Sequence, residues 1–269
     1  MRRLLTSLLL LAVLVLAWCF AEARADPVVR RTALSLPDWP RGAEQMRVLL
    51  WSDIHLGNLA TDRVRLERLV AQANALRPDL VVLAGDYLAG HEPADARAAV
   101  GLAALARLRA PLGIVAVPGN HEHWIGAGAV RRALERAGVA VLANDAARRG
   151  PLAVGGIDDM VTDHESIPRT YRALARVGGA RLLVSHSPDI AHWLPGDGVP
   201  VLAGHTHCGQ VSLPLIGAPV NVSNFGDRFF CGLKRDRGRV VVVGAGTGTS
   251  GLPFRLGAPP DWWVVEVGP

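Results

Sequence analysis

The sequence predicts an α/β fold in which two sheets pack together. Short apolar runs alternate with segments of helical periodicity, and this alternation is typical of a largely parallel sheet. The later apolar runs have few helical segments between them, which indicates a second sheet packed against the first. Half of the 269 residues are hydrophobic and a fifth are charged, so we expect a packed globular core.

Each predicted element rests on its own pattern. Residues 47–51 form a short strand that ends at Ser52-Asp53, and residues 80–84 are continuously apolar, as in a strand buried on both faces. Residues 61–76 carry apolar side chains at helical spacing, with Thr61 as the candidate N-cap. Further strands are predicted at 113–117, 139–142, 152–154, 181–185, 199–203, 239–243 and 262–267. Further helices are predicted at 94–108, 127–137 and 166–177.

Residues 1–25 have the pattern of a targeting segment. Arg2-Arg3 precede an apolar run over 4–20, and Ala23-Arg24-Ala25 offers the small residues of a cleavage site, which together predict a secretory signal peptide. The alternative is an uncleaved membrane anchor, although an apolar run of this length spans only about 25 Å of a bilayer core of about 30 Å. We therefore expect export to the periplasm or to the outer face of the inner membrane, with membrane association.

The rest of the chain divides into a linker and one domain. Residues 26–45 contain three prolines without periodicity and are predicted to be a linker, and residues 46–269 are predicted to be the folded domain. The net charge of +5 falls by two without residues 1–25, and the basic residues are scattered. This charge suits an anionic substrate or an anionic membrane surface, and it does not favour a nucleic acid polymer as partner.

Lysine and cysteine usage narrow the chemistry further. Lys234 is the single lysine, so Schiff-base chemistry is not expected. Three cysteines are too few for a disulfide framework. Cys208 and Cys231 can pair in an oxidising compartment only if their Cα atoms lie close together, which the sequence leaves open.

The polar side chains that can carry chemistry come directly after apolar strands. Since ligands bind at the carboxyl ends of strands in α/β folds, we expect these side chains to meet at one edge. In the pair His205 and His207, alternate residues of an extended segment project to the same side. The full set is Asp53, His55, Asp86, Asn120, His121, His186, His205 and His207.

Five blocks, in this order, resemble the signature of the calcineurin-like metallophosphoesterase superfamily. They are Ser52-Asp53-Ile54-His55, Ala84-Gly85-Asp86, Gly119-Asn120-His121-Glu122, Ser185-His186 and Gly204-His205-Thr206-His207. Residues 204–214 and 246–260 are similar to the exported, membrane-associated bacterial phosphodiesterase branch of that family. The resemblance implies a four-layer α/β/β/α sandwich of two mixed sheets flanked by helices.

The resemblance also implies two divalent metal ions and a catalytic histidine. The first ion would be held by Asp53, His55, Asp86 and His207, and the second by Asp86, Asn120, His186 and His205. Imidazole and carboxylate together suit Mn, Fe or Zn, and a shared carboxylate can hold two ions about 3.5–4 Å apart. A hydroxide bridging the ions would attack phosphorus, Asn120 would also contact a phosphate oxygen, and His121 would protonate the leaving oxygen.

The chain departs from the family pattern at one position. Many members carry a second Asp three residues after the bridging one, and that Asp orients the catalytic histidine; here the position is Ala89. Either His91 or Glu92 replaces the carboxylate, or the leaving group needs less help from an acid, as an aryl, nucleotide or pyrophosphate group does.

The predicted function is metal-dependent hydrolysis of a phosphodiester or pyrophosphate, with a lipid-linked or nucleotide substrate. Two alternatives stay open: a phosphomonoesterase of broad specificity, and a non-catalytic metal-binding protein of the same fold. The oligomeric state also stays open.

Overall fold

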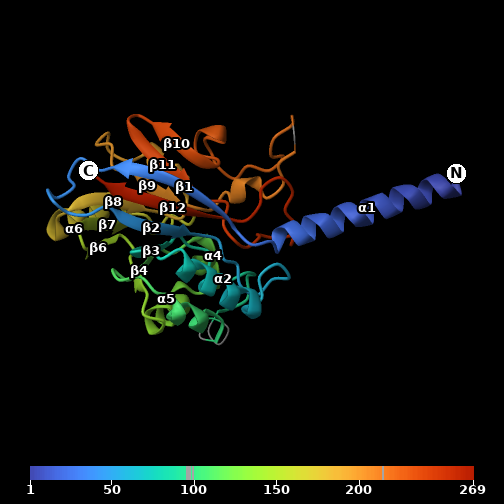
Figure 1. Ribbon diagram of the computed structural model, residues 1–269, viewed down its shortest axis with the longest axis horizontal. Coiled ribbons are helices and arrows are strands. Elements are labelled where there is room, and N and C mark those ends of the chain that lie inside the picture. The colour runs from blue at the N-terminus through green and yellow to red at the C-terminus, as the bar shows by residue number, and fades with distance from the viewer. Residues whose placement is uncertain (95–97, 99, 214) are drawn as a thin grey trace.

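The polypeptide forms two six-stranded sheets that pack face to face, with helices on both outer faces (Figure 1). The structure is a computed structural model, and it describes residues 1–94, 98, 100–213 and 215–269. The sandwich of two mixed sheets flanked by helices is confirmed.

The first sheet holds most of the strands from the first half of the chain. In spatial order it contains β1 (Val28–Ser35), β12 (Asp261–Gly268), β2 (Met46–Trp51), β3 (Leu80–Leu83), β4 (Ile114–Ala116) and β5 (Ala140–Val141). All neighbours run parallel except β12 and β2, which are antiparallel.

The second sheet is built from the later strands. In spatial order it contains β10 (Gly232–Asp236), β11 (Arg239–Val243), β9 (Val201–Ala203), β8 (Ala180–Val184), β7 (Leu152–Gly156) and β6 (Asp145–Arg149). The four central strands run parallel, and the outer pairs β10–β11 and β6–β7 are antiparallel.

Alternate residues of the strands build the core between and outside the sheets. Leu50 and Val82 face the second sheet and join its Val154 and Leu182 in one buried cluster. Their neighbours on the strands face the opposite way, toward the helices on the outer face of the first sheet. Those helices are α2 (Arg63–Ala75), η1 (Leu102–Arg107), α4 (Asn120–Ile125) and α5 (Ala127–Arg136). The second sheet is covered by α6 (Ile167–Val177) and the short helix η2 (Pro188–His192).

The predicted central elements are confirmed, and their ends need small corrections. The helix predicted at 61–76 is α2, and its N-cap is Asp62 rather than Thr61, because the Asp62 side chain accepts a hydrogen bond from the Arg65 amide at 2.8 Å. Of the helix predicted at 94–108, residues 95–97 and 99 lie outside the described residues. Its later part, η1, has the tighter 3₁₀ form.

The expectation of a linker over residues 26–45 is wrong for residues 28–35. These residues form β1, which pairs in parallel with β12 along its whole length. The side chains of β1 alternate between exposed and partly buried positions, so the strand has no continuous apolar run. The sequence pattern therefore does not reveal β1.

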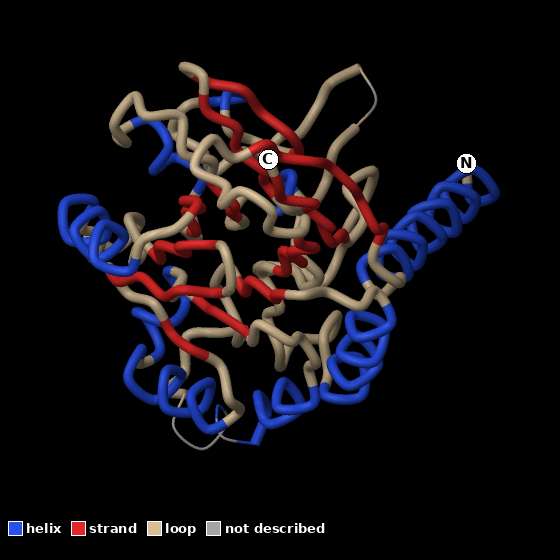
Figure 2. The backbone as a smooth tube through the Cα atoms, turned by 60° about the vertical axis from the view of Figure 1, so that its left-hand side comes forward, coloured by secondary structure: helices blue, strands red, loops and turns tan. Residues whose placement is uncertain are grey.

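Helix α1 (Arg2–Ala23) projects away from both sheets (Figure 1). Its mean hydropathy of 2.6 and its length of 22 residues are sufficient to cross a membrane. Its last two turns touch the domain, where Cys19 and Ala23 are buried. The tube view in Figure 2 shows the strands at the centre and α1 leaving from one side.

Candidate metal centre

The structure brings all eight predicted side chains to one edge of the sandwich. Each lies in a loop or a helix start just after the carboxyl end of a strand, and the strands come from both sheets. The first sheet contributes Asp53, His55, Asp86, Asn120 and His121 through β2, β3 and β4, and the second contributes His186, His205 and His207 through β8 and β9.

One group of donor atoms forms around His55. Its Nε2 atom lies 3.1 Å from His207 Nε2 and 3.4 Å from Asp86 Oδ2. His207 Nε2 lies 3.4 Å from Asp53 Oδ1. We call these four residues the first cluster.

A second group of donor atoms forms around His186. Its Nε2 atom lies 3.1 Å from Asn120 Oδ1, 3.2 Å from His205 Nδ1 and 3.3 Å from Asp86 Oδ2. We call these four residues the second cluster. Asp86 Oδ2 belongs to both clusters, which is the position that a bridging carboxylate requires.

The donor spacing fits shared metal ions. Two ligands about 2.1 Å from one ion and at a tetrahedral angle lie about 3.4 Å apart, close to the 3.1–3.4 Å spacings within each cluster. Asp53 and Asp86 are buried, and among the described residues neither carboxylate pairs with an Arg or Lys. Since buried charges in proteins are paired or bind metals, the arrangement calls for cations.

Burial sets the protonation of these groups. It lowers the pKa of His55 and of His205 to about 3, and it holds the pKa of His207 well below its ordinary range, so these imidazoles are neutral, as metal ligands must be. Burial also raises the pKa of Asp53 to about 7. For Asp86 burial acts in the same direction, but the adjacent His186 outweighs it and holds the pKa well below its usual value.

Backbone geometry holds the donor atoms in place. The Nδ1 atom of His186 lies 2.8 Å from the carbonyl oxygen of Ala84, which leaves Nε2 to face the cluster. Five of the seven predicted metal ligands have a left-handed backbone, an uncommon conformation that gathers at functional sites. They are Asp53 at φ 50°, His55 at 45°, Asp86 at 57°, His205 at 70° and His207 at 51°.

The glycines of the signature blocks are needed for close approach. A Cβ atom at Gly204 would collide with the Asp53 carboxylate, and one at Gly119 would collide with the Asp86 carboxylate. The two loops therefore pass against the ligand side chains with no room for a side chain of their own.

Glu122 connects two loops of the site, a role that the sequence does not reveal. Its carboxylate accepts backbone hydrogen bonds from Asp86 at 2.8 Å, from Tyr87 at 2.9 Å and from Gly119 at 2.8 Å. Burial, reinforced by the charge of Asp86, raises the pKa of Glu122 to about 7. The residue joins the loop after β3 to the loop after β4.

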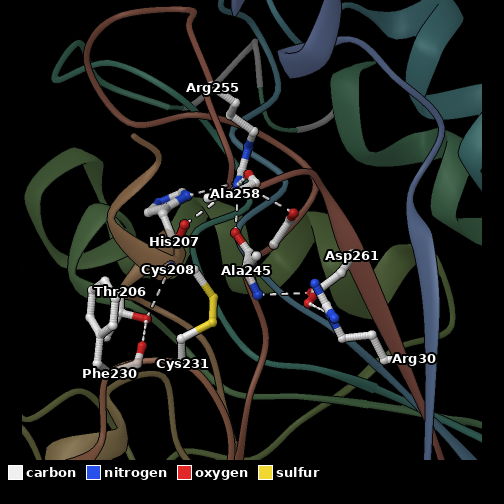
Figure 3. Close-up of a disulfide and its surroundings, with 11 residues drawn as sticks. Arg30, Thr206, His207, Cys208, Phe230, Cys231, Ala245, Arg255, Ala258 and Asp261 are labelled. Carbon is white, nitrogen blue, oxygen red and sulfur yellow. Dashed lines mark hydrogen bonds and ion pairs between the residues drawn. A yellow bond between two sulfur atoms is a disulfide. The ribbon is translucent and has the colours of Figure 1, made fainter. Parts of the chain in front are cut away.

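Arg255 is a second residue whose role the sequence did not reveal. Its guanidinium is fully buried and donates hydrogen bonds to the carbonyl oxygens of Ala245, Gly248 and Ala258 at 2.6–2.7 Å. Its Nη2 atom lies 3.3 Å from His207 Nδ1 (Figure 3). Arg255 therefore contacts His207 at Nδ1, the ring nitrogen that is not one of the cluster's donor atoms.

A disulfide lies next to the same cluster. Cys208 directly follows His207 and is bonded to Cys231, with the two Cα atoms 5.0 Å apart (Figure 3). This answers the question that the sequence left open. The bond ties the His207 loop to the start of the edge strand β10.

His121 faces the clusters, and among the described residues no carboxylate orients it. Its Nε2 atom lies 4.0 Å from Asp86 Oδ2, and its Nδ1 atom has no hydrogen-bond partner among the described residues. Burial lowers its pKa, while Asp86 and the Gly90 backbone act in the opposite direction. The ring is packed between His91 and Trp124, with centroid distances of 5.7 and 4.9 Å. His91 thus contacts His121 through its ring face.

The clusters form the floor of an open cavity of about 910 Å³. His55, Asp86, Asn120, His121, His205 and His207 all line it. The walls are largely apolar and include Trp124, Val220, Val222, Leu252 and Phe254. The site can therefore place a small polar group on the floor and apolar groups against the walls.

Comparison with known proteins agrees with this geometry. Residues 46–209 match the family model of calcineurin-like phosphoesterases, and the range includes all eight residues. The chain belongs to this family.

Several relatives carry the same domain. The chain is 31% identical over 253 residues to an uncharacterized metallophosphoesterase of Aquifex aeolicus (strain VF5), covering 89% of this chain and 91% of that protein. It is 30% identical over 231 residues to the uncharacterized metallophosphoesterase YkuE of Bacillus subtilis (strain 168), covering 82% and 79%. It is 29% identical over 274 residues to a transmembrane protein with metallophosphoesterase domain of Danio rerio, covering 95% and 60%. Among solved structures, a 5'-nucleotidase precursor from Thermus thermophilus aligns with a TM-score of 0.47 at 16% identity, covering 83% and 55%.

Proposed function

We propose that this protein hydrolyses phosphodiester or pyrophosphate bonds with two divalent metal ions. The observation that carries the proposal is the position of Asp86 Oδ2, which lies 3.4 Å from His55 Nε2 in the first cluster and 3.3 Å from His186 Nε2 in the second. Membership of the calcineurin-like phosphoesterase family supports phosphoester hydrolysis.

Each cluster would hold one ion. Asp53, His55, Asp86 and His207 would hold the first, and Asp86, Asn120, His186 and His205 the second. The imidazole and carboxylate donors suit Mn, Fe or Zn. When bound, the ions would supply a hydroxide nucleophile near neutral pH and would neutralise charge on the phosphoryl oxygens.

The residues of the chain then orient the substrate and move one proton. A water-derived oxygen would bond to phosphorus while the bond to the leaving oxygen breaks, and His121, whose Nε2 atom lies 4.0 Å from Asp86 Oδ2, would donate a proton to that oxygen. Because no carboxylate is seen on His121 Nδ1 among the described residues, its help to a basic leaving group would be modest. Aryl, nucleotide and pyrophosphate leaving groups need little help, which favours a diester or pyrophosphate over an alkyl monoester.

We further propose that the domain lies on the outer face of the membrane, anchored by α1. Arg2 and Arg3 are the first residues of α1, ahead of its apolar run, and since positive charge stays on the cytoplasmic side, this order favours a domain on the outside. The Cys208–Cys231 disulfide suits an oxidising compartment. The packing of Cys19 and Ala23 against the domain favours a retained anchor over a cleaved peptide.

The test combines metal analysis with a pair of aryl substrates. The full chain in detergent is expected to bind two ions, to lose activity in EDTA, and to cleave bis-p-nitrophenyl phosphate faster than p-nitrophenyl phosphate. Asp86→Ala should lose bound metal and at least about 100-fold in activity, whereas Asp145→Ala on the edge strand β6 should lose neither. His121→Ala should keep both ions and lose no more than about 100-fold on a phosphodiester whose leaving group is a poor one, the lower end of general-acid catalysis.

The alternatives give different results in the same experiment. Faster cleavage of p-nitrophenyl phosphate would indicate a phosphomonoesterase. Two bound ions with no turnover of any phosphate ester would indicate a non-catalytic metal-binding protein.

A further inference from the structure

Exposed apolar side chains lie in and beside the segments that line the cavity. Leu59 is 71% exposed, Ile216 74%, Val220 64% and Leu252 69%, and Trp124 is half-exposed. Val220, Leu252 and Trp124 also line the cavity. We call these five residues the rim. Exposing several large apolar side chains to water is unfavourable, and such patches on proteins mark interaction sites. The rim is therefore a candidate interaction surface.

The rim lies on the side of the domain from which α1 leaves. Arg24, just past the end of α1, donates a hydrogen bond to the Leu59 carbonyl oxygen at 2.6 Å and pairs with Asp62 at 2.8 Å. The Arg255 amide donates to the Cys19 carbonyl oxygen at 3.0 Å, and Arg255 follows the cavity-lining Phe254. Figures 1 and 2 both show the loop that carries residues 215–222 reaching out on the same side as α1.

No spacer separates the apolar span of α1 from the domain. Trp18 is still two-thirds exposed, whereas Cys19, the next residue, is buried against the domain. If α1 crosses a bilayer, the membrane surface therefore lies near Cys19, and the side of the domain that carries the rim faces it. Trp and long aliphatic side chains are the residues that favour the membrane–water interface.

We propose that the rim inserts into the interfacial layer of the bilayer that α1 crosses, and that the cavity opens on that layer to admit an amphiphilic phosphoester. Its acyl chains would stay in the lipid or lie against the apolar walls, while its phosphate reaches the floor. The choice of substrate class rests on the proposed hydrolysis. The choice of lipid over a protein partner rests on the adjacent α1.

The first arm of the test locates the rim relative to lipid and needs no activity. Full-length Ile216→Trp and Leu233→Trp proteins are reconstituted in vesicles of dibrominated or ordinary phosphatidylcholine; Leu233 is a partly exposed apolar residue on the edge strand β10. The tryptophan fluorescence added by Ile216→Trp should be quenched by the bromine atoms of the lipid, whereas the fluorescence added by Leu233→Trp should persist. Equal emission at both positions, as expected if a protein or a second copy covers the rim, would overturn the proposal.

The second arm compares two substrates with the same leaving group. Reconstituted wild-type protein is offered phosphatidyl-p-nitrophenol within the vesicle and bis-p-nitrophenyl phosphate in water. The double variant Leu59→Asp with Ile216→Asp should lose about tenfold or more on the lipid substrate and keep its rate on the soluble one; Leu233→Asp should keep both. Equal losses on both substrates, or none, would overturn the amphiphilic substrate.

Failure of the proposed hydrolysis gives a different result. The wild type would then cleave neither substrate, and the emission at position 216 alone would decide whether the rim contacts lipid.

Discussion

The two clusters of the candidate metal centre share Asp86 but are supported in different ways. The second cluster rests on the strand ends themselves, since His186 is held by the Ala84 carbonyl oxygen and the Asp86 and Gly119 amides converge on Glu122. The first cluster depends on a distant part of the chain. Arg255 approaches His207 from the segment before β12, and the disulfide fixes the residue after His207.

The difference shows how a buried cationic site is assembled in a sandwich of two sheets. Contacts between the strand ends form when the two sheets pack together, and these contacts position the second cluster. The first cluster needs the segment 245–258, which is held in turn by Arg255 and by Asp261, whose carboxylate accepts from the Ala245 amide at 2.8 Å. The backbone of Arg255 also contacts α1, since its amide donates to the Cys19 carbonyl oxygen at 3.0 Å.

The largest expected effect comes from removing one ligand of either cluster. His207→Ala should leave the second ion bound, and His186→Ala should leave the first, so each variant should bind one ion instead of two. Activity should fall by more than about 100-fold in both, since removing a ligand costs more than removing a residue that supports one. Metal content by mass spectrometry and turnover of bis-p-nitrophenyl phosphate measure the two effects, with His192→Ala, which lies outside both clusters, as the matched control. Loss of both ions in either single variant would show that the clusters do not act as separate sites.

A smaller effect is expected from the residues behind the ligands. Arg255→Lys keeps the charge, but a lysine cannot reach several carbonyl oxygens at once. The variant should therefore lower the affinity of the first cluster for its ion by about 10–100-fold. In Glu122→Gln, an NH₂ group replaces one of the two carboxylate oxygens that accept hydrogen bonds from backbone amides. This variant should lower the affinity of the second cluster for its ion by a similar factor. Titration of metal-free protein with Mn²⁺ should show two binding phases. Arg255→Lys should shift the phase of the first cluster, and Glu122→Gln should shift the phase of the second. If both variants shift the same phase, the division of support described above is wrong.

The sequence reveals the interior of this molecule better than its margins. Strands β2, β3, β8 and β9 are buried on both faces, so each appears as a continuous apolar run with a polar residue at its end. That pattern places six of the eight site residues, and the shorter buried strand β4 places the other two, Asn120 and His121. The three strands that it misses, β1, β6 and β10, are sheet edges with mixed burial. β1 pairs with β12, far away in the chain, whereas β6 and β10 form hairpins with the strands that follow them, β7 and β11. In all three strands, exposed or partly exposed positions interrupt the apolar run that the pattern requires.

The supporting residues of the site are hidden because their contacts depend on tertiary structure. Arg255 lies 48 positions from His207, and a buried arginine looks like any surface arginine in a sequence. Glu122 left a better signal, because it directly follows Asn120 and His121 in a block already singled out. Asp62 shows the limit of cap prediction, since Thr61 and Asp62 are both good N-caps and only the hydrogen bond to the Arg65 amide distinguishes them.

The smallest effect on turnover is expected from the disulfide. Cys208→Ser with Cys231→Ser should lower the free energy of unfolding by about 2–4 kcal/mol, because the bond closes a loop with a sequence separation of 23. Turnover should change little at moderate temperature, since the Thr206 hydroxyl still donates to the Phe230 carbonyl oxygen and keeps the loop near β10. Urea unfolding measures the stability, with Cys19→Ser as the control because Cys19 is the free cysteine. Thiol titration of the denatured wild type should find one reactive group before reduction and three after it. Three thiols before reduction in protein exported by the cell would show that the bond does not form, and would remove the support that it gives to an oxidising compartment.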